Sequence, residues 1–271
     1  MHLQEADIKR TRDIIWEFYA ANSRSFAWRQ TENPYHIFVS EVMLQQTQTA
    51  IVEKKYGPFI AAFPDFASLA QAPFADVLPL WRGLGYNRRA LALHKSAQII
   101  VECYGGVLPN EPTLLDELPG IGSATAASIC AFAFNRPVVF IETNIRTVFI
   151  TLFGGLRTDI TDKELLPLIQ ATLDHEQPRH WYYALMDYGV MLKKTLPNPS
   201  RRSKHYIQQS QFEGSERQIR GMILKAATTK KVFSFEDLCS CIDREPERIR
   251  RNLEELCVEG FLHREGDCFR L

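Results

Sequence analysis

One short run, Leu118-Pro119-Gly120-Ile121-Gly122, constrains the fold more than any other stretch of this sequence. It lies between two segments with helical apolar spacing, so we expect a tight turn joining two helices. Proline presets φ in such a turn, and glycines permit positive φ and a close approach of the backbone to a neighbour. The N–H groups that open the next helix, expected over residues 123–134, lack partners within it and favour a phosphate. The run therefore predicts a helical hairpin that can bind a nucleic-acid backbone.

A carboxylate, Glu142, follows this hairpin. Beside a bound backbone, a carboxylate suits an enzyme that breaks a bond in DNA. The alternative for this motif taken alone is an ordinary helical hairpin with a surface glutamate.

Apolar residues recur with a helical period in nearly every segment. Prolines mark many of the joints, as expected for short helices linked by tight turns. Because candidate strands are few before residue 230, the expected fold class is all-α. The expected helices before the C-terminal part cover residues 8–20, 38–56, 66–72, 74–81, 88–104, 113–118, 123–134, 144–153, 162–173 and 179–192.

The composition changes at residues 195–204, a loop rich in proline, serine and basic residues that is typical of a linker or a binding loop. Three helices are expected beyond it, followed by an alternating tail around a Gly-Asp turn, which favours a hairpin. This outline resembles a winged helix, a module that binds DNA or other proteins about equally often. The expected elements are helices 215–227, 235–241 and 246–259 and a hairpin within 261–271.

The formal net charge is zero, which argues against binding of nucleic acid by bulk positive charge. Basic residues nevertheless gather in two places, each of which could instead be a solvated face. These two sets are Lys193, Lys194, Arg201, Arg202 and Lys204, and Arg82, Arg88, Arg89 and Lys95.

The six cysteines are scattered without the spacing of a disulfide framework, so reduced thiols are expected. Cys239 and Cys241 are too close together for usual zinc spacing and have no second pair. The sequence has no apolar run long enough for a membrane span and no signal-peptide pattern at its start. We therefore expect a cytoplasmic protein.

Seven blocks of the chain resemble the helix-hairpin-helix DNA glycosylases, and most closely the MutY-type adenine glycosylases. The resemblance covers roughly residues 10–192, and the block at 40–48 is highly specific. It implies a two-domain glycosylase fold with four parts: an N-terminal helix (1–25) packed on a helical domain (135–213), a six-helix domain with the hairpin (26–134) and the winged-helix-like module (214–271). The matching residues are Trp28-Arg29, Pro34-Tyr35, Ser40-Glu41-Val42-Met43-Leu44-Gln45-Gln46-Thr47-Gln48, Trp81-x-Gly83-Leu84-Gly85-Tyr86, Leu118-Pro119-Gly120-Ile121-Gly122, Ile141-Glu142-Thr143-Asn144 and Met186-Asp187-x-Gly189.

The resemblance implies catalytic roles for Glu41, Glu142 and Asn144. Cleavage of an N-glycosidic bond passes through an oxocarbenium-like sugar, so one group must protonate the departing base and another must stabilise the cation. Glu41 corresponds to the group that protonates the purine and prepares the water, Glu142 to the essential aspartate, and Asn144 would orient the sugar or a water. Burial should raise the pKa of Glu41. The alternative is a partly buried helix residue with a salt-bridge partner.

The expected DNA contacts follow from the same resemblance. The target base must leave the stack, which requires a pocket and a wedge that fills the gap. Glutamine amides would read base edges, with Leu44 or Gln45 as the wedge. A monovalent cation, Na⁺ or K⁺, would bind backbone oxygens of Leu118 and Gly120. The complete set of expected DNA contacts is Leu44, Gln45, Gln46, Gln48, Tyr86, Asn87, Arg88, Gly120, Ile121, Gly122 and Ser123.

The sequence departs from the family pattern in four respects. Glu142 replaces an aspartate, and the lysine that bifunctional relatives such as endonuclease III use as a Schiff-base amine is Ala124 here. Residues 193–212 contain no cysteine, so the family's iron–sulphur cluster cannot be ligated there. The larger C-terminal domain of the family, which reads 8-oxoguanine, is replaced by the short module 214–271.

Together these features predict a monofunctional DNA glycosylase without a cofactor other than the cation. It would act as a monomer on double-stranded DNA with mispaired adenine, in a bacterial or archaeal nucleoid. Alternatives are a glycosylase for mismatched thymine or a damaged purine, a catalytically silent lesion-binding protein, and a transcription regulator that binds through the winged helix.

Overall fold

The structure, a computed structural model, describes residues 3–208 and 211–271. Residues 1–2 of the expected N-terminal part (1–25) and residues 209–210 of the expected helical domain (135–213) lie outside the described residues. Helices make up most of the chain, which confirms the expected all-α class, and the named strands lie beyond residue 231. Among the described helices, none combines the length and the apolarity needed to cross a membrane.

The chain divides into two compact units, Met1–Val42 with Leu108–Gln208, and Met43–Val107 with Gln209–Leu271. This division differs from the expected one, because segment 26–134 contributes to both units. As boundaries of independently folding domains, the four expected segments remain a prediction.

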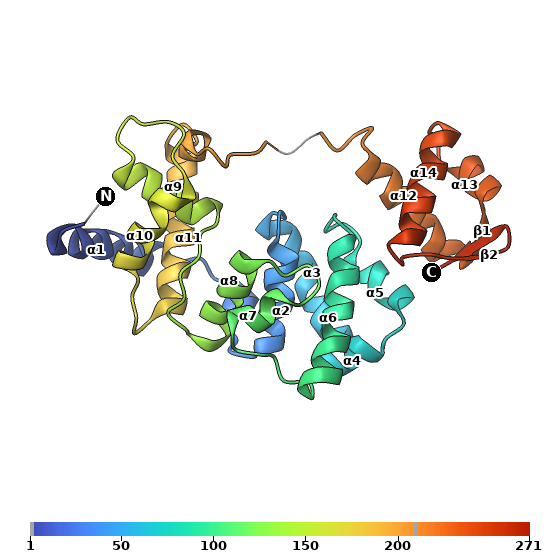
Figure 1. Cartoon of the computed structure of the whole chain (residues 1–271), viewed down its shortest axis with the longest axis horizontal. Helices are drawn as coiled ribbons and strands as arrows, with labels where there is room; N and C mark the ends of the chain where they lie inside the picture. Colours follow the sequence, from blue (N-terminus) through green and yellow to red (C-terminus); the bar gives the residue numbers. More distant parts are fainter. Residues whose placement is uncertain (1–2, 209–210) are drawn as a thin grey trace. The chain divides into compact units, whose positions relative to one another are not determined.

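In the first unit α9 packs against α11, and α1 packs against α10 and α11 (Figure 1). Its core contains the fully buried side chains of Trp181, Tyr182, Phe132 and Phe149. Its elements are α1 (Glu5–Asn22), η1 (Ala27–Arg29), α2 (Pro34–Leu44, up to Val42), α7 (Pro112–Asp116), α8 (Ser123–Phe134), α9 (Thr143–Phe153), α10 (Asp162–Thr172), α11 (Pro178–Thr195) and η2 (Pro199–Arg202).

The second unit joins four helices of the first half of the chain to the C-terminal module. The module forms a three-stranded antiparallel sheet in the order β1-β3-β2, with Phe233 opposite Phe269. The elements are α3 (Thr49–Ala62), α4 (Phe66–Gln71), α5 (Phe74–Trp81), α6 (Arg88–Tyr104), α12 (Glu216–Lys230), β1 (Val232–Ser234), α13 (Phe235–Cys241), α14 (Pro246–Val258), β2 (His263–Glu265) and β3 (Cys268–Arg270).

The expectation of one helix over residues 38–56 is wrong. α2 ends at Leu44 and α3 begins at Thr49, with Gln46 between them at φ 53°. The Arg89 guanidinium donates to the carbonyl oxygens of Met43 at 2.9 Å and Gln45 at 2.6 Å, which satisfies groups that a helix end leaves unpaired. A partner more than forty residues away thus replaces the helical hydrogen bonds. The short strand β1 was also not expected from the sequence.

Candidate active site

Glu41 lies on α2 with its carboxylate bound to a serine of α8. Ser128 Oγ lies 2.6 Å from Glu41 Oε2 and 2.9 Å from the Thr125 carbonyl oxygen. Burial raises the pKa of Glu41 to about 7; the Ser128 hydrogen bond opposes the shift, Glu142 adds to it and Arg29 opposes it. A carboxyl group with this pKa can both donate and accept a proton near neutral pH. The sequence offered no signal for Ser128, which stands in an alanine-rich apolar helix.

Glu142 caps the N-terminus of α9. Its Oε1 accepts the backbone N–H groups of Asn144 at 2.7 Å and Ile145 at 2.9 Å, and its Oε2 accepts the Asn144 side-chain amide at 3.2 Å. A carboxylate has about four acceptor positions, so these three donors leave one on Oε2. The cap therefore fixes the carboxylate while one oxygen keeps capacity to face a developing positive charge.

The Asn144 amide is held from its other side by Lys193 of α11. Lys193 Nζ donates to Asn144 Oδ1 at 2.8 Å, which fixes the amide nitrogen toward Glu142. Burial lowers the pKa of Lys193, while the charge of Glu142 opposes that shift. The sequence shows Lys193 only as part of a basic group, because its amide partner lies 49 positions earlier in the chain.

Gly189 permits the close approach of α11 to α9 at this point. A Cβ atom at Gly189 would lie 2.4 Å from the Asn144 carbonyl oxygen and 2.8 Å from Asn144 Cβ. These contacts are backbone and first side-chain atoms, which cannot move without shifting α9. Gly189 thereby sets the position of Asn144, which binds both Glu142 and Lys193.

Gly189→Ala should therefore destabilise the protein by about 1–3 kcal/mol, as overpacking of a filled interior does. Chemical denaturation measures this change. Gly221→Ala is the matched control, since a Cβ there would meet nothing within 4 Å and alanine favours a helix. Equal stability of Gly189→Ala and the wild type would contradict the close packing.

Two arginines enclose a buried carboxylate on α11 in the same unit. Asp187, 3% exposed, accepts from Arg24 Nε at 2.7 Å and from Arg29 Nη1 at 2.9 Å and Nη2 at 3.0 Å. The Arg29 guanidinium also lies 4.4 Å from the centre of the Tyr183 ring. The cluster holds in place the arginine whose charge acts on Glu41. Both Arg29 and Asp187 stand in the matched blocks, but no role was expected for them.

The hairpin Leu118–Gly122 forms the tight turn that its sequence predicts. Gly120 has φ 73°, and the Ile121 N–H donates to the Leu118 carbonyl oxygen at 3.1 Å. Gly122 is the N-cap of α8 and has no side chain that could cap that end. Leu118 and Ile121 are buried, whereas Gly120, Gly122 and Ser123 are exposed. The exposed backbone can approach an anion.

The expected DNA contacts at 44–48 and 86–88 belong to the second unit, separate from the hairpin. Gln46 and Gln48 are exposed, and Leu44, Gln45, Tyr86 and Asn87 are half-buried. Arg88 is exposed but pairs with Glu259 at 2.5 Å.

Arg89, expected in a basic surface set, is buried. Besides Met43 and Gln45, it donates to Thr47 Oγ1 at 2.9 Å and to the carbonyl oxygens of Leu84 at 3.0 Å and Gly85 at 3.1 Å. It thus fixes segment 45–48 to the glycine loop.

The segment in which the family carries its cysteine motif is held by other polar contacts. Ser200 Oγ lies 3.0 Å from Thr147 Oγ1 of α9, and Arg202 Nη2 donates to the carbonyl oxygens of Gly154 at 3.0 Å and Gly155 at 2.6 Å. Over residues 3–208 and 211–271, no group of three or more histidine, cysteine, aspartate or glutamate side chains is placed to hold a metal ion. Hydrogen bonds to α9 and to the backbone of Gly154 and Gly155 therefore hold this segment.

Residues 39–171 match a protein family described as HhH-GPD superfamily base excision DNA repair protein. The chain is 34% identical over 183 residues to the adenine DNA glycosylase of Buchnera aphidicola subsp. Baizongia pistaciae, covering 66% of this chain and 51% of that protein. It is 29% identical over 275 residues to the adenine DNA glycosylase of Mycolicibacterium smegmatis, covering 93% and 92%. The chain thus spans about half the length of the Buchnera relative and nearly all of the mycobacterial one.

Solved structures share the fold. A thermostable thymine-DNA glycosylase superposes with a TM-score of 0.63 at 24% identity, covering 73% of this chain and 91% of that chain. Endonuclease III in a non-covalent DNA complex superposes with a TM-score of 0.59 at 19% identity, covering 68% and 85%. The expected helix-hairpin-helix fold is confirmed. Through residues 39–171 the chain belongs to the HhH-GPD superfamily of base excision DNA repair proteins, and its sequence is similar to those of adenine DNA glycosylases.

Proposed function

We propose that the protein is a monofunctional DNA glycosylase that hydrolyses the N-glycosidic bond of a flipped base, with mispaired adenine as its substrate. The observation that carries this proposal is Glu41, whose carboxyl is bound by Ser128 and has a pKa of about 7, electrostatically coupled to Glu142. The adenine specificity is supported by the names of the sequence relatives.

In this mechanism Glu41 in its protonated form donates to the departing purine. The glycosidic bond breaks, its electrons leave with the base, and positive charge develops on the sugar. The unused acceptor position on Glu142 Oε2 stabilises that charge, and Asn144 holds the carboxylate in place. Glu41, now ionised, accepts a proton from the attacking water. The product is a free base and an intact strand with an abasic site.

The absence of strand cleavage follows from Ala124, which stands where bifunctional relatives have the lysine amine. The exposed backbone of Gly120–Ser123 would bind phosphates, and a monovalent cation at the carbonyl oxygens of Leu118 and Gly120 would complete that contact. Tyr86 and the glutamines of 45–48 would contact bases. The protein would act as a monomer on DNA in the bacterial cytoplasm, as the bacterial repair relatives suggest.

The rate of base release should depend on pH through Glu41. Because the protonated carboxyl is the active form and its pKa is about 7, the single-turnover rate should fall as pH rises above 7. The hydrogen bond from Ser128 lowers this pKa, so Ser128→Ala should move the midpoint of the fall to higher pH. A midpoint unmoved by Ser128→Ala would contradict the assignment of the proton donor.

The substrate is tested with duplexes that carry adenine opposite 8-oxoguanine, adenine opposite guanine, thymine opposite guanine, or hypoxanthine. Abasic sites are revealed by alkaline cleavage on a gel. Release of adenine alone supports the proposal. Release of thymine or hypoxanthine instead would refute the adenine specificity and assign that other base as the substrate. These two duplexes are included because Glu142 replaces an aspartate and because the fold is similar to that of a thymine-DNA glycosylase. No abasic product from any duplex, with DNA bound equally by Glu41→Gln, would indicate a silent lesion-binding protein.

A further inference from the structure

Tyr86 directly follows the glycine loop Gly83–Gly85. Gly83 at φ 96° and Gly85 at φ 73° precede it, and Tyr86 itself has φ 46°, a region that non-glycine residues seldom adopt. Such a conformation persists only where neighbouring groups fix it. Tyr86 is half-buried, so the rest of its side chain is accessible for binding.

Arg217 from the C-terminal module supplies one of these neighbours. Its Nη1 donates to the Tyr86 hydroxyl at 2.8 Å, and its guanidinium lies 5.3 Å from the centre of the ring. Arg89 lies 5.6 Å from the same ring. The tyrosine therefore contacts two guanidinium groups, one from α6 and one from the first turn of α12.

The module is packed firmly enough to position this arginine. One hydrophobic core joins Leu78 of α5 and Leu91 of α6 to Ile223 and Phe261 of the module. Glu259 links the same surfaces, because it pairs with both Arg88 and Arg220 at 2.5 Å. The module and helices α5 and α6 form parts of the same compact unit.

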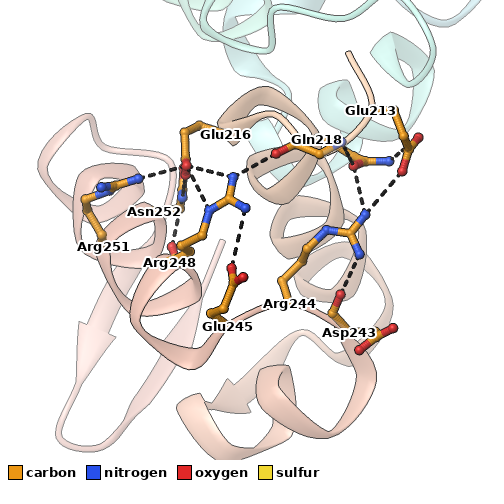
Figure 2. A network of polar contacts seen from close by, with 10 residues as sticks. Glu213, Glu216, Gln218, Asp243, Arg244, Glu245, Arg248, Arg251 and Asn252 are labelled. Atoms are coloured by element: carbon orange, nitrogen blue, oxygen red, sulfur yellow. Dashed lines mark hydrogen bonds and ion pairs between the residues drawn. The ribbon is translucent and has the colours of Figure 1, made fainter. Parts of the chain in front are cut away.

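The module's own charges argue against a role as a separate DNA-binding domain. Residues 214–271 contain 11 acidic and 11 basic side chains, whereas DNA-binding surfaces are rich in positive charge. Helix α14 carries Arg248, Arg250 and Arg251. Figure 2 shows that Arg248 and Arg251 both pair with Glu216, at 2.8 Å, and that Arg244, in the turn before α14, pairs with Glu213 at 3.2 Å and binds Gln218 at 3.0 Å.

We propose that the C-terminal module, residues 214–271, acts as a brace for the glycine loop, with Arg217 as the residue that positions Tyr86 for contact with DNA. The module then contributes to DNA binding through Tyr86 and not through α14. This inference rests on the proposed function, since it takes the DNA duplex as the partner of Tyr86.

The test is a double-mutant cycle in the full chain, with binding to a duplex that carries a non-hydrolysable abasic-site analogue followed by fluorescence anisotropy. Arg217→Met and Tyr86→Phe should each raise Kd about tenfold, the effect of losing one well-formed contact. The double variant should bind no more weakly than either single variant, because both changes remove the same hydrogen bond. Additive effects would overturn the proposal.

Arg250→Met is the matched control, since Arg250 lies 4.0 Å from the Phe235 ring in the same module and contacts the ring by stacking. Its Kd should equal that of the wild type. A rise in Kd for Arg250→Met or Arg251→Met as large as that for Arg217→Met would overturn the brace in favour of direct binding by α14. The double-mutant cycle measures DNA binding and does not depend on base release. If the wild-type protein released no base, the proposed function would be refuted, but the cycle would still test whether Arg217 positions Tyr86.

Tyr86→Phe also guards against misfolding as an explanation, because it keeps the ring and removes only the hydroxyl. As a positioning residue, Arg217 should leave the pH midpoint of base release unchanged in Arg217→Met. A shifted midpoint would place its effect on Glu41 and would overturn the assignment to Tyr86.

Discussion

Glu41→Gln is expected to lower the single-turnover rate of base release by about 10²–10⁴-fold, the usual contribution of a general acid. Glutamine keeps the shape of the side chain and can still accept the hydrogen bond from Ser128, so the fold should be retained. It cannot, however, donate a proton to the leaving base. Rapid-quench assays at a saturating concentration of enzyme measure the rate.

Glu102→Gln is the control for this substitution, because Glu102 is an exposed residue of α6. Its rate should match that of the wild type, and DNA binding should be similar in all three proteins. A rate for Glu41→Gln within a factor of two or so of the wild type would exclude Glu41 as the proton donor.

Glu142→Gln is expected to reduce the rate by about 10²–10³-fold, a loss comparable to the removal of one preorganised electrostatic group. The amide oxygen can still accept from the Asn144 and Ile145 backbone N–H groups, so the helix cap is retained in part and stability should fall by about 1 kcal/mol or less. A large loss of rate with little loss of stability would show that the reaction needs the negative charge of Glu142 and not only its role in the helix cap. Single-turnover kinetics and urea denaturation measure the two quantities.

Glu142→Asp is the informative companion to this variant. It keeps the negative charge and restores the residue that the family resemblance places here, although it shortens the side chain by one methylene. We expect its rate to lie above that of Glu142→Gln. If Glu142→Asp and Glu142→Gln were equally slow while both proteins remained folded, the carboxylate charge would not be the property that matters.

The helical segments could be predicted well from the sequence because most of them carry strong amphipathic periodicity and end near prolines or glycines. The break between Leu44 and Thr49 could not, because residues 45–48 include no proline or glycine to mark it and the group that ends α2 is Arg89, far along the chain. The strand β1 could not be predicted either, because it has only three residues and its conformation depends on pairing with β3.

In the candidate site, the sequence pointed to the carboxylates but not to the side chains that hold them. Glu41, Glu142 and Asn144 stand in blocks whose residue types already suggest chemistry. Ser128 and Lys193 do not, since a serine in an apolar helix and a lysine in a basic run have many ordinary explanations. Their contacts arise only when α8 and α11 are packed against the rest of the first unit.

The most direct test of adenine excision by this protein is product analysis by mass spectrometry after the wild-type protein acts on a duplex with adenine opposite 8-oxoguanine. We expect free adenine and an intact strand that carries an abasic site, both absent with Glu41→Gln. Intact substrate after long incubation with excess wild-type protein, or adenine released equally by Glu41→Gln, would contradict it.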